Sequence, residues 1–245
     1  MDRDDPLRGL AALMGIFTVI PSRGSPEEAA RWFYAVPVIG FVRGLITSIS
    51  LLALGHFPPY VVAGLAVALH YVGQGFMHAD GFADFSEALA ASRFGADPRA
   101  VLKDTHRGSF AVASFAVLVT LLFSASLYAA SSGYLLAFVV AEVGHVMGMA
   151  AAIRAGREEP YEGMARTFKE HMSNGMLAAI YLLSAIIVFL LGGGGLVVGV
   201  PIAAAIAGWA SAAAANRIVG FTNGDAIGFA GEVAYLASLL MIAHA

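Results

Sequence analysis

The sequence contains no cysteine, and only 13% of its residues are charged. Without cysteine the chain has no disulfide, no thiolate nucleophile and no zinc–thiolate site. Soluble globular proteins carry roughly 25% charged residues, so a soluble fold is not expected. The net charge of −3 and the lack of a long basic run exclude an extended nucleic-acid surface. We therefore expect no nucleic-acid partner.

The sequence is rich in apolar residues. They make up 59% of the 245 residues, and the mean hydropathy is +0.77. This composition indicates an all-α, polytopic membrane helical bundle with the lipid bilayer as its solvent. We expect one integral membrane domain over residues 1–245. We expect no cleavable signal peptide, because the first eight residues mix acids and arginines.

About seven apolar runs predict transmembrane helices. They cover residues 32–54, 60–77, 110–130, 134–153, 176–191, 197–215 and 229–243. A further run, Pro6 to Ile20, ends at Pro21 and is too short to cross a hydrocarbon core of about 30 Å. It predicts a short N-terminal re-entrant or interfacial helix.

Basic residues are distributed unevenly between the connecting segments. The turns GHFPP, SSG and GGGG would share one side of the membrane, and none contains Lys or Arg. Nearly all basic residues, and most acids, lie in or beside the loops of the other side. By the positive-inside rule this side is predicted to be cytoplasmic.

Residues 73–110 form a polar, acid-bearing segment between apolar runs. Asp80, Asp84 and Glu87 stand at i, i+4 and i+7, so a helix would place their carboxylates on one face. Such a concentration of like charge is typical of a site where Mg²⁺ binds among carboxylate and phosphate oxygens. Asp104 would add a ligand from a second element. A solvated amphipathic helix is the structural alternative.

Cations near these acids could bind a pyrophosphate. Lys103 and Arg107 lie in KDTHRG, and Arg166 lies in the loop segment 154–174. Charges that set the membrane topology would explain the loop arginines equally well. His78, two residues before Asp80, is placed to bond a phosphate oxygen or to shape the site entrance.

A second carboxylate follows a turn in the segment 216–232. Asp225 comes after Asn223 and Gly224, where Asp commonly caps a helix. It could also reach the metal cluster or act as a base on an attacking hydroxyl.

Polar and ionisable residues inside the predicted spans cost free energy to bury in a membrane, and each is therefore treated as a candidate functional residue. Glu142 and His145, at i and i+3, could satisfy each other or line a lumen. His70 and Gln74, near the end of the second predicted span, would satisfy a bundle interior.

The run HADGFADFSEAL followed by KDTHRGSF resembles the signature of the adenosylcobinamide-GDP ribazoletransferases, the cobalamin synthase family. Further blocks occur in the family's order along almost the whole chain: LAALMGIFTVIPSR, FYAVPVIGFVRGLI, REEPYEGMARTF and GFTNGDAIGFAGEVAYL. Two positions depart from the pattern. Glu87 stands where the family more often has Asp, and Asn223 lengthens its Thr-Gly-Asp run by one residue.

The resemblance implies a Mg²⁺-dependent transferase of a prokaryotic cell membrane with its active site facing the cytoplasm, in segments 73–110, 154–174 and 216–232. It would join adenosylcobinamide-GDP to α-ribazole or α-ribazole 5′-phosphate and release GMP. A homo-oligomer is compatible with the sequence. On this basis the metal ligands are Asp80, Asp84, Glu87 and Asp104; the catalytic residues are Asp84, Asp104 and Asp225; the substrate-binding residues are His78, Lys103, Arg107 and Arg166.

Two other functions are alternatives to this one. A CDP-alcohol phosphatidyltransferase uses similar chemistry, but its D-G-x-x-A-R signature is broken here because Asp84 and Phe85 replace Ala-Arg. An ion-coupled transporter would use Glu142 and His145 as its cation site. The acids instead concentrate in the predicted cytosolic segments.

Overall fold

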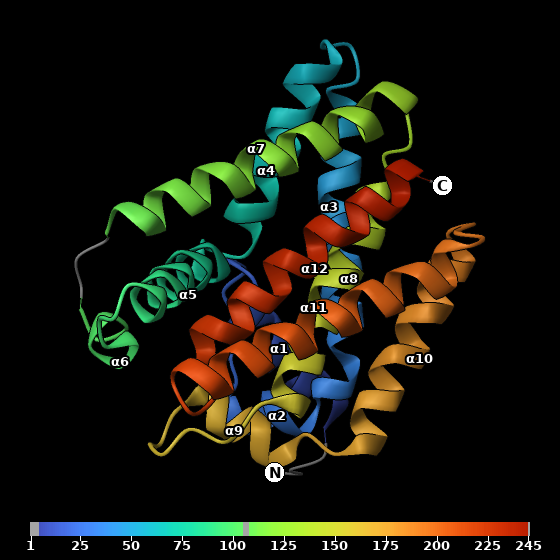
Figure 1. The fold of residues 1–245 in the computed structure, drawn as a ribbon. Coiled ribbons are helices and arrows are strands. Elements are labelled where there is room, and N and C mark those ends of the chain that lie inside the picture. The colour runs from blue at the N-terminus through green and yellow to red at the C-terminus, as the bar shows by residue number, and fades with distance from the viewer. Residues whose placement is uncertain (1–4, 105–107, 245) are drawn as a thin grey trace.

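The computed structural model describes residues 5–104 and 108–244. Over these ranges the chain is a bundle of helices without strands, so the predicted all-α class is confirmed (Figure 1). The helices are α1 (Pro6–Phe17), α2 (Pro26–Arg31), η1 (Phe33–Ala35), α3 (Val36–Ala53), α4 (Pro59–Gly73), α5 (Met77–Arg93), α6 (Pro98–Val101), α7 (Ser109–Ser132), α8 (Ala137–Ala155), α9 (Met164–His171), α10 (Asn174–Leu190), α11 (Leu196–Ile218) and α12 (Gly224–His244).

The number of spans agrees with a polytopic membrane protein. Within the described ranges, five helical segments are long and apolar enough to cross a membrane, and up to seven if each of two bent helix pairs counts as one span. The apolar N-terminal run forms the 12-residue helix α1, which is too short to cross. The chain is therefore a membrane protein with a short N-terminal helix.

The predicted second span does not run straight into the acidic segment. α4 ends at Gly73, and α5 leaves it at an angle of 91°. The turn uses Gly75 at φ 63° and Phe76 at φ 60°, both in the left-handed region that favours glycine. Because of this bend α5 packs beside α12 instead of continuing the line of α4. A similar bend of 93° separates α9 from α10.

The central helix of the bundle is α8. Its residues 137–153 are all buried, and α3, α11 and α12 pack around it. Glycine allows close approach here, because a Cβ on Gly40 of α3 would lie 2.8 Å from the carbonyl oxygen of Glu142. Small residues at helix contacts are the usual way in which membrane helices pack.

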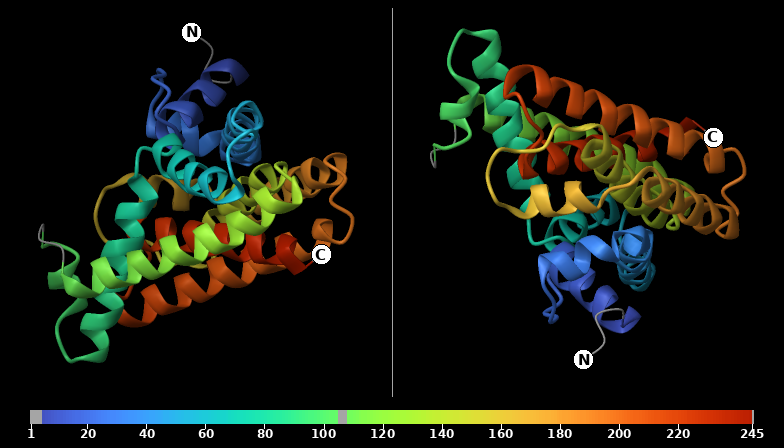
Figure 2. Two further views of the ribbon diagram at one scale, coloured as in Figure 1. Left: turned by 90° about the horizontal axis from the view of Figure 1, so that it is seen from above. Right: turned by 90° about the horizontal axis from the view of Figure 1, so that it is seen from below.

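The turns without Lys or Arg lie apart from the basic segments. In Figure 1 the α3–α4 and α7–α8 turns are at the top and the α10–α11 turn is at the right, whereas α2, α6 and α9 lie at the bottom and lower left. The two further views in Figure 2 keep α1 and α2 together, away from the C-terminus. The spatial arrangement thus follows the charge pattern of the sequence.

Candidate functional site

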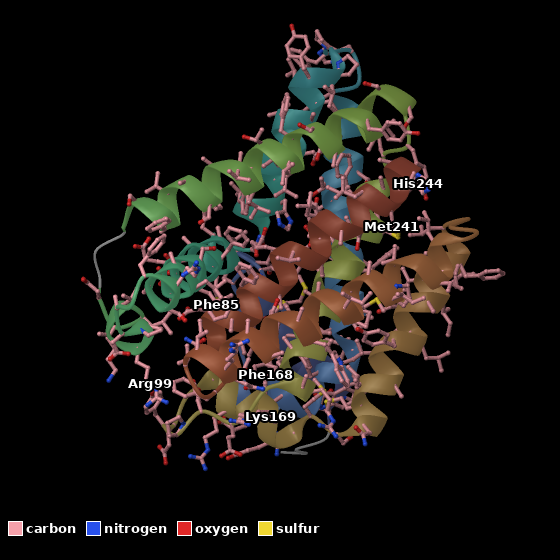
Figure 3. The ribbon with its side chains drawn as sticks, viewed as in Figure 1. Phe85, Arg99, Phe168, Lys169, Met241 and His244 are labelled. Atoms are coloured by element: carbon pink, nitrogen blue, oxygen red, sulfur yellow. The ribbon has the colours of Figure 1, made fainter. Side chains whose placement is uncertain are left out.

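A pocket of about 260 Å³ opens at the end of the bundle that carries the basic loops. Asp80 of α5 and Asp225 of α12 both line it, together with His78. Apolar side chains from α1, α8 and α9 form the rest of the wall, among them Phe17 and Phe168, and Figure 3 labels Phe168 on α9. The pocket therefore combines carboxylates at the helix ends with an apolar floor.

Close packing of α5 on α12 brings the two aspartates into one pocket. A Cβ on Gly81 would lie 3.1 Å from the Cα atom of Asp225, and one on Gly228 would lie 3.3 Å from the Cα atom of His78. Larger residues at either glycine would push the helices apart. These glycine contacts bring together Asp80 and Asp225, which are 145 positions apart in the sequence.

The start of α12 holds Asp225 without using it as the cap. Asn223 accepts the N–H of Ala226 with its side-chain oxygen at 3.2 Å, and its amide nitrogen donates to Asp225 Oδ2 at 2.7 Å. The additional residue Asn223 is thus the capping residue, and Asp225 lies in the first helical turn. The carboxylate of Asp225 is oriented by the cap.

The acids of α5 are on a helix, as predicted. Asp80 is exposed, whereas Asp84 and Glu87 are half-buried. Glu87 lies two turns, roughly 10 Å, along the helix from Asp80. Its Oε2 accepts the N–H of Ala111 at 2.6 Å, in the first turn of α7, where a negative charge is favoured. Glu87 therefore joins α5 to the start of α7.

The remaining predicted residues are spread more widely. Lys103 and Asp104 are exposed and follow α6, while Arg107 lies outside the described residues. Arg166 faces a different, polar pocket, where its Nε lies 3.1 Å from Glu158 Oε1 and 2.9 Å from Glu170 Oε1. Arg166 is thus not brought into the pocket of Asp80 and Asp225.

Glu159 is a buried acid near Asp225 that could not be identified from the sequence. It is buried in the loop between α8 and α9, and its Oε1 accepts the N–H of Arg166 at 3.2 Å. Burial raises the pKa of the Glu159 carboxyl above its usual value; the Arg166 N–H opposes the rise, and the nearby Asp225 charge adds to it. The only signal in the sequence was its place in the REEPYEGMARTF block.

A second group of polar residues lies in the centre of the bundle. Arg43 Nη2 of α3 lies 2.7 Å from Glu142 Oε2 of α8, and His70 Nδ1 of α4 lies 2.8 Å from Glu142 Oε1. His145 of α8 is hydrogen-bonded through Nε2 to His78 Nδ1 at 2.9 Å. The proposed pairing of Glu142 with His145 is therefore replaced by partners on other helices.

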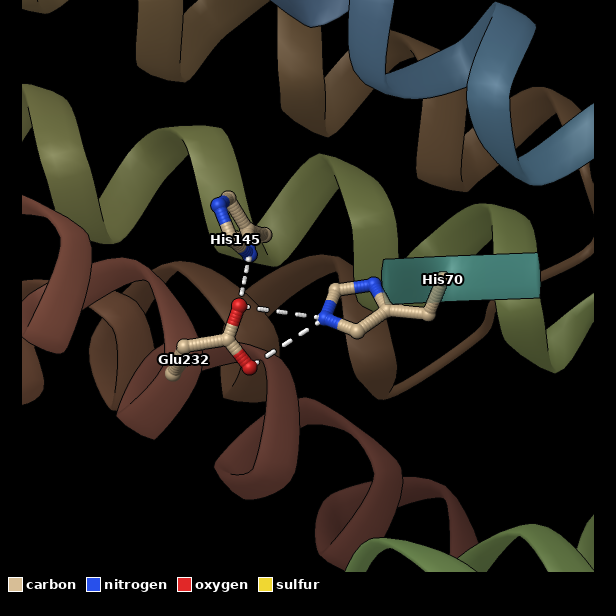
Figure 4. Close-up of side chains that lie close together, drawn as sticks. All are labelled: His70, His145 and Glu232. Carbon is tan, nitrogen blue, oxygen red and sulfur yellow. Dashed lines mark hydrogen bonds and ion pairs between the residues drawn. The ribbon is translucent and has the colours of Figure 1, made fainter. Parts of the chain in front are cut away.

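Glu232 of α12 completes this buried group. Its carboxylate accepts an N–H of Gln74 at 2.9 Å and lies 3.2 Å from His70 Nε2 (Figure 4). Neither Arg43 nor Glu232 was singled out from the sequence. Glu232 could have been found as the final acid of the GFTNGDAIGFAGEVAYL block, and Arg43 as the charged residue of the FYAVPVIGFVRGLI block, inside the predicted span 32–54.

The two groups differ in the chemistry that they allow. Carboxylates at the pocket mouth can reach a water-soluble, phosphate-bearing ligand and a hard cation. The buried group has no open side to water, since Glu142, His145 and Glu232 are at most 1% exposed. His78 belongs to both, because it lines the pocket and bonds to His145.

Comparison with known proteins gives a consistent result. The profile of the family described as cobalamin-5-phosphate synthase matches residues 9–243. The adenosylcobinamide-GDP ribazoletransferase of Corynebacterium glutamicum is 32% identical over 160 residues, which cover 60% of this chain and 51% of that protein. The protein of the same name from Methanocella arvoryzae is 28% identical over 252 residues, which cover 95% of this chain and 94% of that protein.

The extent of these matches differs between relatives. The chain spans about half the length of the first curated relatives that it matches, including a second Corynebacterium protein at 51%. No solved structure matches the chain. The family match nevertheless extends over nearly all of the sequence, from α1 to α12. The chain belongs to the cobalamin-5-phosphate synthase family.

Proposed function

We propose that the chain joins adenosylcobinamide-GDP to α-ribazole or α-ribazole 5′-phosphate. A ribose hydroxyl of the ribazole attacks the phosphorus on the cobinamide side of the diphosphate. The P–O bond to GMP breaks, GMP leaves, and the hydroxyl proton passes to a base on the protein. The product is adenosylcobalamin or its 5′-phosphate.

The observation that carries the proposal is the meeting of Asp80 and Asp225 at one pocket. The two residues come from separate motif blocks of the family and are held together by the contact of Gly81 with the backbone of Asp225. Attack of a hydroxyl on a diphosphate needs a cation to offset the negative charge, which a carboxylate can hold, and a base to receive the hydroxyl proton. This pocket offers a carboxylate for each.

The donor set at the pocket fits Mg²⁺. Carboxylate oxygens are the ligands that this hard cation prefers, and Asp80 and Asp84 stand one helical turn apart on α5. Asp80 and Asp84 are proposed to hold it. Glu87, which lies roughly 10 Å from Asp80 along the helix and is bonded to Ala111, and Asp104 after α6 are proposed to join them only if substrate binding moves them. When bound, the ion would offset the negative charge of the diphosphate.

The residues of the chain then have distinct roles. Asp225, fixed by Asn223, and Asp84 are the candidates for the base that takes the hydroxyl proton. His78 at the pocket wall, and Lys103 and Arg107 after α6, are proposed to contact phosphate oxygens. Arg166 would have to leave Glu158 and Glu170 to do so, and we propose that substrate binding draws it away.

The site is proposed to face the cytoplasm of a prokaryotic cell. The basic loops lie at the same end of the bundle as the pocket, and basic loops favour the cytoplasmic side. Nucleotide-linked substrates are soluble there. The apolar side chains that α1, α8 and α9 contribute to the pocket would keep bulk water from competing with the ribazole hydroxyl.

Turnover by the purified protein in liposomes tests the proposal. Adenosylcobinamide-GDP, α-ribazole or its phosphate, and Mg²⁺ are supplied, and GMP and the corrinoid product are measured together. Asp80→Asn is expected to lower kcat by about 100-fold or more, as for the loss of one electrostatic group in a preorganised site. Chelation of the divalent ion should have a similar effect.

His56→Gln is the matched control, because His56 is exposed in the turn between α3 and α4, far from the pocket. It should retain full turnover. Failure of the folded wild-type protein to form product with either ribazole substrate would refute the proposed function.

A further inference from the structure

Three ligand-type side chains meet in the centre of the bundle. His70 of α4 and His145 of α8 each direct one ring nitrogen toward the carboxylate of Glu232 of α12, and the three ligand atoms all lie within 4.8 Å of one another (Figure 4). All three side chains are completely buried or nearly so. The family resemblance and the proposed transfer reaction assign no role to this group.

The separations are compatible with metal ligands, and they are long for hydrogen bonds between charged groups. His70 Nε2 lies 3.2 Å from both oxygens of Glu232, and His145 Nδ1 lies 3.9 Å from Glu232 Oε1. Charge-assisted hydrogen bonds are shorter, about 2.7–2.9 Å. Two atoms that each bind a tetrahedral Zn²⁺ at about 2.0–2.1 Å lie roughly 3.4 Å apart. The observed distances lie on either side of that value.

The outer nitrogen of each imidazole is already held. His70 Nδ1 is bonded to Glu142 Oε1 at 2.8 Å, and Glu142 is in turn paired with Arg43 at 2.7 Å. His145 Nε2 is bonded to His78 Nδ1 at 2.9 Å. Metal-binding histidines typically donate their second nitrogen to a carboxylate or another acceptor, which orients the ring. Glu142 provides such a carboxylate for His70.

Two buried atoms of this group lack a hydrogen-bond partner among the described residues. They are His145 Nδ1, directed toward Glu232, and the side-chain oxygen of Gln74. Gln74 places its amide nitrogen 3.1 Å from His70 Nε2 and 2.9 Å from Glu232 Oε1. Rotation of the Gln74 amide by half a turn would put its oxygen where its nitrogen now lies, next to His70 and Glu232. A buried polar atom without a partner is costly, and a bound cation would satisfy both.

We propose that His70, His145 and Glu232 bind one Zn²⁺ ion, with the amide oxygen of Gln74 as the fourth ligand. Two imidazoles and a carboxylate suit zinc, whereas Mg²⁺ prefers oxygen ligands alone. With four protein ligands the site is closed, so its role is structural. The ion links α4, α8 and α12 and fixes His78 through His145. This site is separate from the acids of the pocket mouth.

The metal content of the purified wild-type protein is the first test. The protein is produced with zinc in the medium and a tag that contains no histidine, and metals are measured by inductively coupled plasma mass spectrometry. About one zinc per chain is expected, as for a closed structural site. X-ray absorption at the zinc edge should show imidazole nitrogen in the first coordination shell. Both measurements use the wild-type protein, so they do not depend on whether a variant folds.

Variants assign the zinc to these side chains. His145→Gln and Glu232→Gln should each reduce bound zinc by about tenfold or more, because each removes a ligand. His56→Gln, which changes an exposed histidine, and Asp80→Asn, which changes an exposed acid, should keep it. Folded wild-type protein without zinc would overturn the proposal and indicate that a proton on His70 balances Glu232. Zinc retained in both ligand variants would overturn it as well.

Discussion

The mouth of the pocket and the centre of the bundle contain the same kinds of side chain in opposite environments. At the mouth, Asp80 is exposed and Asp225 half-buried. In the centre, Glu142 and Glu232 are at most 1% exposed and each is bonded to a histidine. A buried carboxylate must be paired within the protein, whereas one at the surface keeps contact with water.

This difference separates residues that act on a substrate from residues that hold the helices. Substitutions at the mouth should change turnover and leave the fold intact. Substitutions in the centre should act first on stability, and on turnover only through the position of His78. Three predictions test this contrast.

The largest effect is expected for Arg43→Met. This change leaves the carboxylate of Glu142 buried with His70 as its remaining hydrogen-bond partner. Removing one partner of a buried ion pair costs about 3–5 kcal/mol of unfolding free energy. Denaturant titration in detergent micelles would measure it. The double variant Arg43→Met with Glu142→Gln should recover most of the loss, since both members of the ion pair are then uncharged; no recovery would contradict the assigned pairing.

Gly81→Ala should have a smaller effect, and mainly on turnover. Its Cβ would lie 3.1 Å from the Cα atom of Asp225, so α5 and α12 must separate by a few tenths of an ångström. Because misplacement by about 1 Å can cost 100-fold, we expect roughly a tenfold lower kcat/KM. Gly64→Ala on α4 is the control, since its nearest neighbour would be 3.9 Å away. Equal losses in the two variants would count against the α5–α12 contact as the device that positions Asp225.

The smallest effect concerns Glu159 and pH. Because its pKa is raised in the folded state, the folded protein binds this proton more tightly than the unfolded chain does. Its contribution to stability is therefore present at low pH and is lost as the pH rises through the raised pKa. Glu159→Gln should have a higher Tm than the wild type at neutral pH, with a difference that shrinks toward pH 4. Thermal unfolding in detergent without divalent ions measures it, and a constant difference would contradict the raised pKa.

The sequence was sufficient for the fold class and for one side of the site. Long apolar runs specify membrane helices because a bilayer leaves no other way to satisfy the backbone. The i, i+4 spacing of Asp80 and Asp84 was enough to place both on one face of α5, since helical periodicity is local. The bend at Gly75 and Phe76 was missed, because the predicted span 60–77 was continued through both residues on hydropathy, and hydropathy does not report a change of helix direction.

What the sequence alone determined is thus local: the apolar helices, the short N-terminal element, the distribution of basic loops and the order of the family's motif blocks. The tertiary structure decided which distant residues meet. It joined Asp80 to Asp225 through a glycine contact, turned Arg166 toward Glu158 and Glu170, and assembled Arg43, His70, Glu142 and Glu232 from four helices. Helix propensity and hydropathy depend on neighbours within a few turns, whereas these contacts depend on how helices far apart in the chain pack against one another.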